Sequence, residues 1–262
     1  MRLYNLIDST SFNRSNLMKE IIKKITPNFI LHYYNQLKYS YLEATFAGST
    51  PKETFTKIYN SNFWRSKSSV SGPGSEDSQT NSIIEALRLL IYKYKIKSIL
   101  DLPCGDFIWM KNIDLGSINY LGADIVDRLI QENLKNHTNE PNISFSVLDL
   151  ITDNLPKSDL ILNRDCLVHF SYKDIYSSIK NIKASDSTYL LTTTFPNHTR
   201  NTDIITGKWR PLNLQIKPFN FPEPIVIITE NCTEENDKYR DKSLSLWKTI
   251  DIKLPIKNYE KI

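Results

Sequence analysis

The chain has 262 residues, of which 40% are hydrophobic and 24% are charged, a balance that excludes a globally disordered chain. This length suits one large domain better than two full ones. Lysine and arginine outnumber aspartate and glutamate by 33 to 29, and the net charge of +4 is scattered rather than striped. We therefore expect weak attraction to anions and no nucleic-acid partner.

The cysteines and the lengths of the apolar runs indicate in which cellular compartment the protein is expected. Cys104, Cys166 and Cys232 are an odd and widely spaced set, so neither a disulfide framework nor a CxxC metal pair is predicted. No apolar run reaches the length of a membrane span, and the first residues lack a signal-peptide pattern. These observations predict a cytoplasmic protein that binds no structural metal.

The first 65 residues are predicted to form a helical N-terminal cap. Residues 17–25 place apolar side chains at helical spacing opposite lysines, and residues 29–46 are apolar and rich in tyrosine. We favour packing on the main domain, although a basic amphipathic helix can also make peripheral contact with a membrane surface. Residues 66–75 then hold two of only seven glycines and are predicted to be a loop.

Residues 66–262 are predicted to form one α/β domain. A helix is expected over residues 79–95, and from residue 97 short β-branched runs alternate with helical stretches, which indicates a mostly parallel sheet with helices on both faces. The expected strands are residues 97–102, 119–125, 143–148, 159–163, 188–195, 225–230 and 244–252. The expected helices between them are residues 107–112, 126–136 and 172–182. Residues 196–224 show no period, and we expect a functional loop there.

Three successive predicted strands each have an acid at their carboxyl end: Asp101, Asp124 and Asp149. Ligands of open α/β sheets bind at the carboxyl ends of the strands. An acid about twenty residues past the first loop can accept both hydroxyls of a ribose, and a third can accept from an exocyclic amine such as that of adenine. A single such Asp is usually a turn or helix cap, but three in order favour a nucleotide site.

The phosphate-binding signatures of nucleotide sites are incomplete here. Where a dinucleotide fold requires GxGxxG, only Gly105 stands and Pro103 occupies the first glycine position. The P-loop pattern is absent as well. The sequence therefore favours a ligand with adenosine and no phosphate.

The segment Asp-Leu-Pro-Cys-Gly-Asp at residues 101–106 resembles, with Pro103 as a departure, the first loop of class I S-adenosylmethionine-dependent methyltransferases. The resemblance covers residues 60–252 and extends to residues 71–75, 163–169 and 245–247. It implies the Rossmann-like class I fold with a seven-stranded, mostly parallel sheet, and it implies S-adenosylmethionine as the cofactor. The residues that it assigns to the cofactor are Trp64, Ser71, Gly72, Gly74, Ser75, Asp101, Pro103, Cys104, Gly105, Asp106, Asp124, Ile125, Asp149, Leu150, Asn163 and Arg164.

The fourth strand opens onto the expected reaction site. Methyl transfer requires an aligned acceptor and, for a hydroxyl, a nearby base. His169 has a pKa suited to that task, and Asp165 is the other candidate, either as base or as the group that orients His169. The structural alternatives are a hydrogen-bonded turn for His169, an ion pair with Arg164 for Asp165, and buried apolar roles for Cys104 and Cys166.

The acceptor is expected to be a small molecule or a glycan. Arg164, His198, Asn201 and Arg210 are predicted to bind it, because a polar and aromatic loop suits a sugar or a phosphate-bearing group. The resemblance to a bacterial subgroup implies O-methylation in surface-polysaccharide (capsule) biosynthesis, with a phosphoramidate-type group as one option.

Other functions remain open from the sequence. They are a nucleic-acid or protein methyltransferase, a non-catalytic nucleotide-binding partner subunit, and a nicotinamide oxidoreductase. The predicted fourth strand leads into Asn-Arg-Asp-Cys rather than the Asn/Asp-Pro-Pro-aromatic motif of amino-methylating members. This difference argues against a nucleic-acid methyltransferase.

Overall fold

The computed structural model describes residues 44–64, 66, 69–137 and 140–253. The chain divides into two units, residues 1–47 and 48–262, and the account below concerns the second. The predicted helix over residues 17–25 lies outside the described residues, and so does nearly all of the predicted segment 29–46. The N-terminal cap therefore stays a prediction. Helix α3 (Pro51–Asn60), which falls inside the predicted cap region, is part of the second unit.

Two helices precede the sheet. Helix α3 begins with a capping box, in which Thr50 and Glu53 each accept a hydrogen bond from the other's backbone amide. The predicted helix over residues 79–95 is confirmed as α4 (Asp77–Tyr94). It buries Ile83, Leu87 and Leu90 along one face and ends at Lys95, which has a left-handed backbone.

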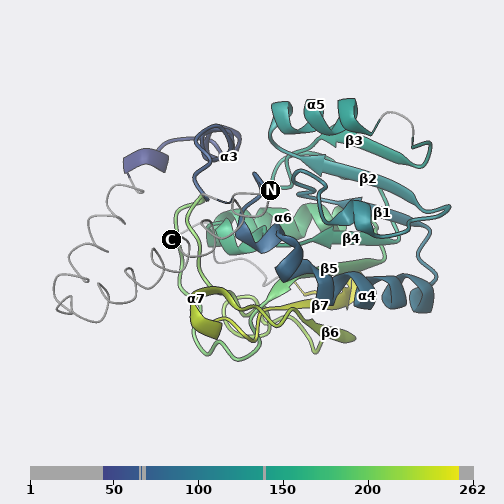
Figure 1. Ribbon diagram of the computed structural model, residues 1–262. Helices are drawn as coiled ribbons and strands as arrows, with labels where there is room; N and C mark the ends of the chain where they lie inside the picture. Colours follow the sequence, from purple (N-terminus) through teal and green to yellow (C-terminus); the bar gives the residue numbers. More distant parts are fainter. Residues whose placement is uncertain (1–43, 65, 67–68, 138–139, 254–262) are drawn as a thin grey trace, which may run out of the picture. The chain divides into compact units, whose positions relative to one another are not determined.

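The predicted seven-stranded sheet is confirmed, although the last strand, predicted over residues 244–252, ends at Lys248 because Thr249–Asp251 form a 3₁₀ turn. Its strands are β1 (Ser98–Asp101), β2 (Asn119–Asp124), β3 (Ile143–Val147), β4 (Leu160–Asn163), β5 (Tyr189–Thr194), β6 (Val226–Thr229) and β7 (Ser243–Lys248). They lie in the order β3-β2-β1-β4-β5-β7-β6, and Figure 1 shows this order from top to bottom. All neighbours pair in parallel except β7, which is antiparallel to both β5 and β6.

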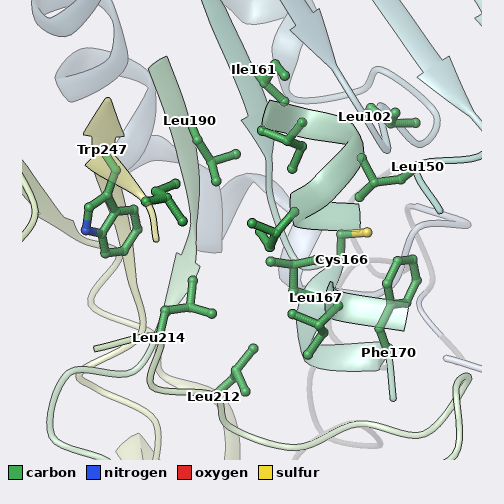
Figure 2. Close-up of a cluster of buried hydrophobic side chains, with 14 of the residues drawn as sticks. Leu102, Leu150, Ile161, Cys166, Leu167, Phe170, Leu190, Leu212, Leu214 and Trp247 are labelled. Atoms are coloured by element: carbon green, nitrogen blue, oxygen red, sulfur yellow. The ribbon is translucent and has the colours of Figure 1, made fainter. Parts of the chain in front are cut away.

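Alternate strand residues supply two separate cores, one on each face of the sheet. Leu100, Ile161 and Leu190 pack in one cluster together with the buried face of α6 (Tyr172–Ala184). Figure 2 shows 14 residues of a buried cluster, among them Ile161 and Leu190. Ile99, Leu160 and Leu191 belong to the opposite cluster, with α4 and with Ile130 of α5 (Asp127–Asn136). Because both faces are covered, the central strands β1, β4 and β5 are buried over almost their whole length, as a parallel sheet requires.

The helix predicted over residues 107–112 is wrong. The segment after β1 forms turns, followed by a 3₁₀ turn over Met110–Asn112. Gly105 and Phe107 have φ angles of 55° and 57°, and a left-handed backbone cannot continue an α-helix. Phe107 is buried against Tyr120 and Phe145, so side-chain packing outweighs the helical spacing of this segment.

The long segment between β5 and β6 is irregular, as predicted, but it is firmly packed. Leu212, Leu214, Phe219 and Phe221 are buried in the cluster on the α6 face. The amide of Phe195 donates to Leu212 O, which ties the segment to the end of β5. This packing holds the loop at the carboxyl edge of the sheet, where the predicted site lies.

Candidate active site

A cavity of about 560 Å³ opens at the carboxyl edge of the sheet. Its wall combines the ends of the first five strands, the loop over residues 70–75, three side chains of α3 and the connection between β6 and β7. It brings together most of the predicted site residues: Trp64, Ser71, Gly72, Gly74, Ser75, Asp101, Pro103, Cys104, Gly105, Asp124, Ile125, Asp149, Leu150, Arg164, Asp165 and His169.

The other predicted site residues lie outside this wall: Asp106, Asn163, His198, Asn201 and Arg210. The Asn163 side chain is fully buried and bridges two strand ends, because its amide donates to Leu102 O (2.6 Å) and its oxygen accepts from Thr192 Oγ1 (3.0 Å). Asn201 donates to Asn213 O at 2.8 Å and so braces the long loop. These contacts give Asn163 and Asn201 structural tasks.

Two loops of the wall are joined through Asp106. Its carboxylate accepts from Ser69 Oγ (2.8 Å) and from Val70 N (3.0 Å), and its own amide donates to Ser71 Oγ (3.0 Å). Gly105 permits this approach, because a Cβ there would stand 2.2 Å from Ser71 Oγ. The first loop and residues 69–71 therefore form one connected rim.

The strand-end acids Asp101, Asp124 and Asp149 all line the cavity, and we call them the carboxylate edge. Burial raises the pKa of Asp101 to about 7, although Tyr120 donates to it at 2.6 Å. Burial also raises the pKa of Asp124 to about 6, against the lowering effect of nearby backbone amides such as that of Val126. Asp149 differs because it caps its own turn, accepting from Ile151 N and Thr152 Oγ1.

His169 ends a 3₁₀ turn over Leu167–His169 and faces the same cavity. Its Nδ1 lies 3.0 Å from Lys208 O, and a carbonyl only accepts, so Nδ1 carries the proton and Nε2 is left as the basic atom. Burial lowers the pKa of His169 to about 4, which keeps the ring neutral at pH 7. The Trp64 ring lies 4.6 Å from the imidazole and fixes its other side.

Arg210 positions His169 from behind. Its guanidinium is buried and donates to the carbonyls of Leu167, Val168 and Phe170 at 2.8–3.0 Å, which surround the histidine in sequence. These bonds satisfy the carbonyl end of the turn. The predicted acceptor-binding arginine is thus fully engaged with backbone.

Five charged side chains form a second group, which we call the ionic cluster: Arg164, Asp165, Glu230, Glu234 and Lys242. All of them except the buried Glu230 line the cavity. Arg164 is bound by both oxygens of Glu230, at 2.6 and 3.2 Å. Lys242 Nζ lies 2.6 Å from Asp165 Oδ2 and 3.3 Å from Glu230 Oε2. Such paired and hydrogen-bonded charges are the form in which buried ions are tolerated.

Asp165 has an unusual backbone and a strongly acidic side chain. Its φ is 51°, and its amide donates to Thr193 Oγ1 at 2.8 Å. Burial alone would raise its pKa, but Lys242 and Arg164 outweigh burial and lower the pKa to about 2. A carboxylate this acidic is a weak base, so His169 is the stronger base candidate of the two.

Sequence reasoning missed Glu230, Glu234, Lys242 and Cys232, as well as the aromatic wall residues Tyr59, Trp109, Phe195, Trp209 and Tyr239. A signal for two of them existed. Glu230 follows β6 and Lys242 precedes β7, and in the antiparallel pair these positions lie opposite each other, with Glu230 N donating to Lys242 O. Opposite charges at the mouth of a hairpin would have indicated an ion pair.

The three cysteines are buried and free. Burial raises the pKa of Cys166 to about 12 and that of Cys104 well above its usual value, so neither is a thiolate at neutral pH. Within the described residues no group of His, Cys, Asp and Glu is suited to hold a metal ion, and no described helix is long and apolar enough to cross a membrane.

Comparisons with known proteins were made at three levels. Neither a protein-family model nor a curated protein matches the sequence. A solved structure of magnesium protoporphyrin IX methyltransferase from Synechocystis PCC 6803 with bound SAM matches at TM-score 0.54 and 14% identity, over 77% of this chain and 98% of that one.

A second match is phosphoethanolamine N-methyltransferase 1 from Haemonchus contortus, in complex with phosphoethanolamine and S-adenosylhomocysteine. Its TM-score is 0.53 and its identity 12%, over 76% of this chain and 48% of that one. The present chain therefore spans about half the length of that protein. At these identities the likeness concerns the fold, and the chain has the Rossmann-like fold of class I S-adenosylmethionine-dependent methyltransferases.

Proposed function

We propose that this chain is an S-adenosylmethionine-dependent O-methyltransferase that acts on a small carbohydrate or phosphate-like acceptor in surface-polysaccharide biosynthesis. The fold and the carboxylate edge support the cofactor. The observation that carries the proposal is His169, a neutral imidazole that lines the same cavity as Asp101 and Asp124 and is protonated on Nδ1.

The residues present fit the cofactor. The Asp124 carboxylate ends β2 and has oxygens suited to a ribose diol, and Leu148 and Leu150 offer an apolar surface for adenine. Gly105 lets the first loop approach closely, which a side chain there would prevent. Bound S-adenosylmethionine supplies an electrophilic methyl group on a sulfonium.

The chain's own task is to position the acceptor and to take its proton. His169 Nε2 would accept the proton of an acceptor hydroxyl, and the bound cofactor would supply the methyl group to that oxygen. Lys208 O accepts from Nδ1–H, which leaves Nε2 unprotonated, and this bond partly offsets the lowering of the His169 pKa by burial. Asp165 contributes its negative charge near the imidazolium that forms, since it is among the groups that raise the pKa of His169.

The charges of the wall bear on which acceptor is used. Arg164 is bound by Glu230 and Lys242 by Asp165, so a phosphate-like acceptor would have to compete with carboxylates already in place. A hydroxyl of a neutral sugar does not have to displace these carboxylates, but it does need a base to take its proton. The contacts therefore favour the carbohydrate over the anion.

Two measurements test the proposal. Calorimetric titration with S-adenosylhomocysteine and with NAD should show binding of the first and not of the second. Transfer of labelled methyl from S-adenosylmethionine to sugars, sugar phosphates and phosphoramidates should then yield an O-methyl product. Binding of NAD alone, or methylation of nucleic acid or protein only, would contradict the proposal.

A further inference from the structure

One carboxylate of the ionic cluster lacks the partner that the others have. Glu234 lines the cavity, and its Oε1 is a buried atom for which the described residues supply no hydrogen-bond partner. Its Oε2 has only a long contact with the Cys232 thiol, at 3.8 Å. A buried carboxylate oxygen without a donor is unfavourable unless a ligand supplies the donor.

The nearby cations are already committed to other carboxylates. Lys242 and Arg164 are close enough to lower the pKa of Glu234, yet burial outweighs them and raises it. With both cations bound by Asp165 and Glu230, the cluster has two positive charges against three negative ones when Glu234 is ionised. One positive charge from outside the protein would restore the balance.

Aromatic rings lie in the same cavity wall. The Trp209 ring lies 4.7 Å from that of Tyr239, and each is 6.0 Å from the ring of Phe195. Lys238 Nζ stands 5.0 Å from the centre of the Tyr239 ring, so this aromatic group already accepts a cation. Carboxylate and aromatic faces together are the surroundings that favour an ammonium group over a neutral or anionic one.

We propose that Glu234 binds an ammonium group carried by the acceptor, so that the substrate is an amine-bearing molecule methylated at a separate oxygen. This inference rests on the proposed function, because it assigns the acceptor side of that cavity. The ammonium donates to Glu234 Oε1 and compensates the excess negative charge of the ionic cluster. Glu234 is then the residue that selects for amino-substituted acceptors.

Small probes test this without knowledge of the whole acceptor. The full chain is saturated with S-adenosylhomocysteine, and binding of ethylammonium and of ethanol is followed by the fluorescence of the cavity tryptophans. We expect ethylammonium to bind, and Glu234→Gln to weaken it about ten- to hundred-fold, as for loss of a charge-assisted hydrogen bond. Ethanol should be unaffected by the substitution, and Glu85→Gln, at an exposed site on α4, serves as the matched control.

Cofactor affinity and thermal stability separate the other possibilities. Glu234→Gln should leave the affinities for S-adenosylhomocysteine and S-adenosylmethionine unchanged and should raise the Tm of the free protein, because it removes an unpartnered buried charge. Loss of affinity for S-adenosylmethionine alone would place Glu234 at the sulfonium and overturn the inference. Equal ethylammonium binding by the two proteins, or a lowered Tm, would overturn it as well. Failure of the wild type to bind S-adenosylhomocysteine would instead refute the proposed function.

Discussion

The carboxylate edge and four of the five residues of the ionic cluster line one cavity, but the two groups are assembled in different ways. Asp101 and Asp124 end β1 and β2, and Asp149 follows β3, so the order of strands alone places all three. The cluster joins residues far apart in sequence, with Arg164 and Glu230 separated by 66 positions and Asp165 and Lys242 by 77. One group follows from local sequence, and the other follows from topology.

The two groups also differ in how their charges are compensated. Asp101 and Asp124 have raised pKa values because burial is only partly offset, whereas opposite charges dominate at Asp165 and lower its pKa. Groups held in an unfavourable state by the fold are typical of ligand sites, and compensated ion pairs are typical of structural ones. Substitutions on the carboxylate edge should therefore weaken ligand binding without destabilising the fold. Substitutions that break the ion pairs of the ionic cluster should destabilise the fold.

The largest effect is expected at His169, which lines the same cavity as both groups. His169→Ala should lower single-turnover methyl transfer by about 10²–10⁴-fold, because it removes the base, and should leave cofactor affinity nearly unchanged. Asp165→Asn is the companion variant. Full activity of His169→Ala with an inactive Asp165→Asn would move the base to Asp165, and full activity of both would indicate an acceptor that arrives deprotonated.

The rate should also depend on pH in one direction. Since the pKa of His169 is lowered to about 4, the imidazole is neutral above that pH and gains a proton below it. We expect a rate that is flat at neutral pH and falls toward pH 4. A fall centred near pH 6.5 would show that the ring is more accessible to water than the structure indicates.

The next effect concerns stability. Glu230→Ala removes the carboxylate that binds the buried Arg164 with both oxygens and leaves it only the carboxylate of Asp165, at 3.4 Å, so it should lower the free energy of unfolding by about 3–5 kcal/mol. Urea denaturation measures this, and Glu223→Ala, at an exposed position of the long loop, is the control. A loss below about 1 kcal/mol would mean that the cluster contributes little to the fold.

A binding effect of intermediate size is expected on the carboxylate edge. Asp124→Asn should weaken S-adenosylhomocysteine binding at pH 8 by about ten- to hundred-fold, because charged hydrogen bonds to the ribose are lost. The wild-type affinity should fall below pH 6, where Asp124 gains a proton, and the variant should lack this fall. Equal affinities in calorimetry, with Asp114→Asn as the exposed control, would place the nucleoside elsewhere.

The smallest effect is a gain in stability. The pKa of Asp101 is raised to about 7 in the folded protein, so folding favours its protonated form, and its charge becomes destabilising as pH rises from about 4 to about 7. Asp101→Asn should therefore raise the free energy of unfolding at pH 8 by at least about 1 kcal/mol and have little effect at pH 4. A destabilised variant at pH 8 would indicate that the bond from Tyr120 matters more than the buried charge.

The sheet could be predicted from the sequence because each strand is a short run that contains apolar residues and lies between turns or helices. The helix predicted after β1 failed because apolar spacing does not report φ, and Gly105 and Phe107 both have left-handed backbones. The same limit applies to Asn163 and Arg210, whose polar side chains resemble ligand contacts in sequence. In the fold they bind backbone carbonyls instead.

The site residues differ in the same way, because some are recognisable from local sequence and others only from tertiary contacts. The carboxylate edge was identified because its acids recur at successive strand ends. Glu230 and Lys242 were missed because their partners lie on another strand, and Glu234 was missed because a missing hydrogen bond is visible only once burial is known. Tertiary pairing, and not residue type, decides which charged residue is structural and which is available.

The connection through Asp106 has a kinetic consequence. Val70 to Ser75 line the cavity, and a single carboxylate that lies outside it accepts the bonds from Ser69 and Val70 that hold this rim in place. These bonds couple the first loop to residues 69–71, so we expect the two parts of the rim to move together. We therefore expect Asp106, which lies outside the cavity wall, to affect ligand dissociation more than encounter.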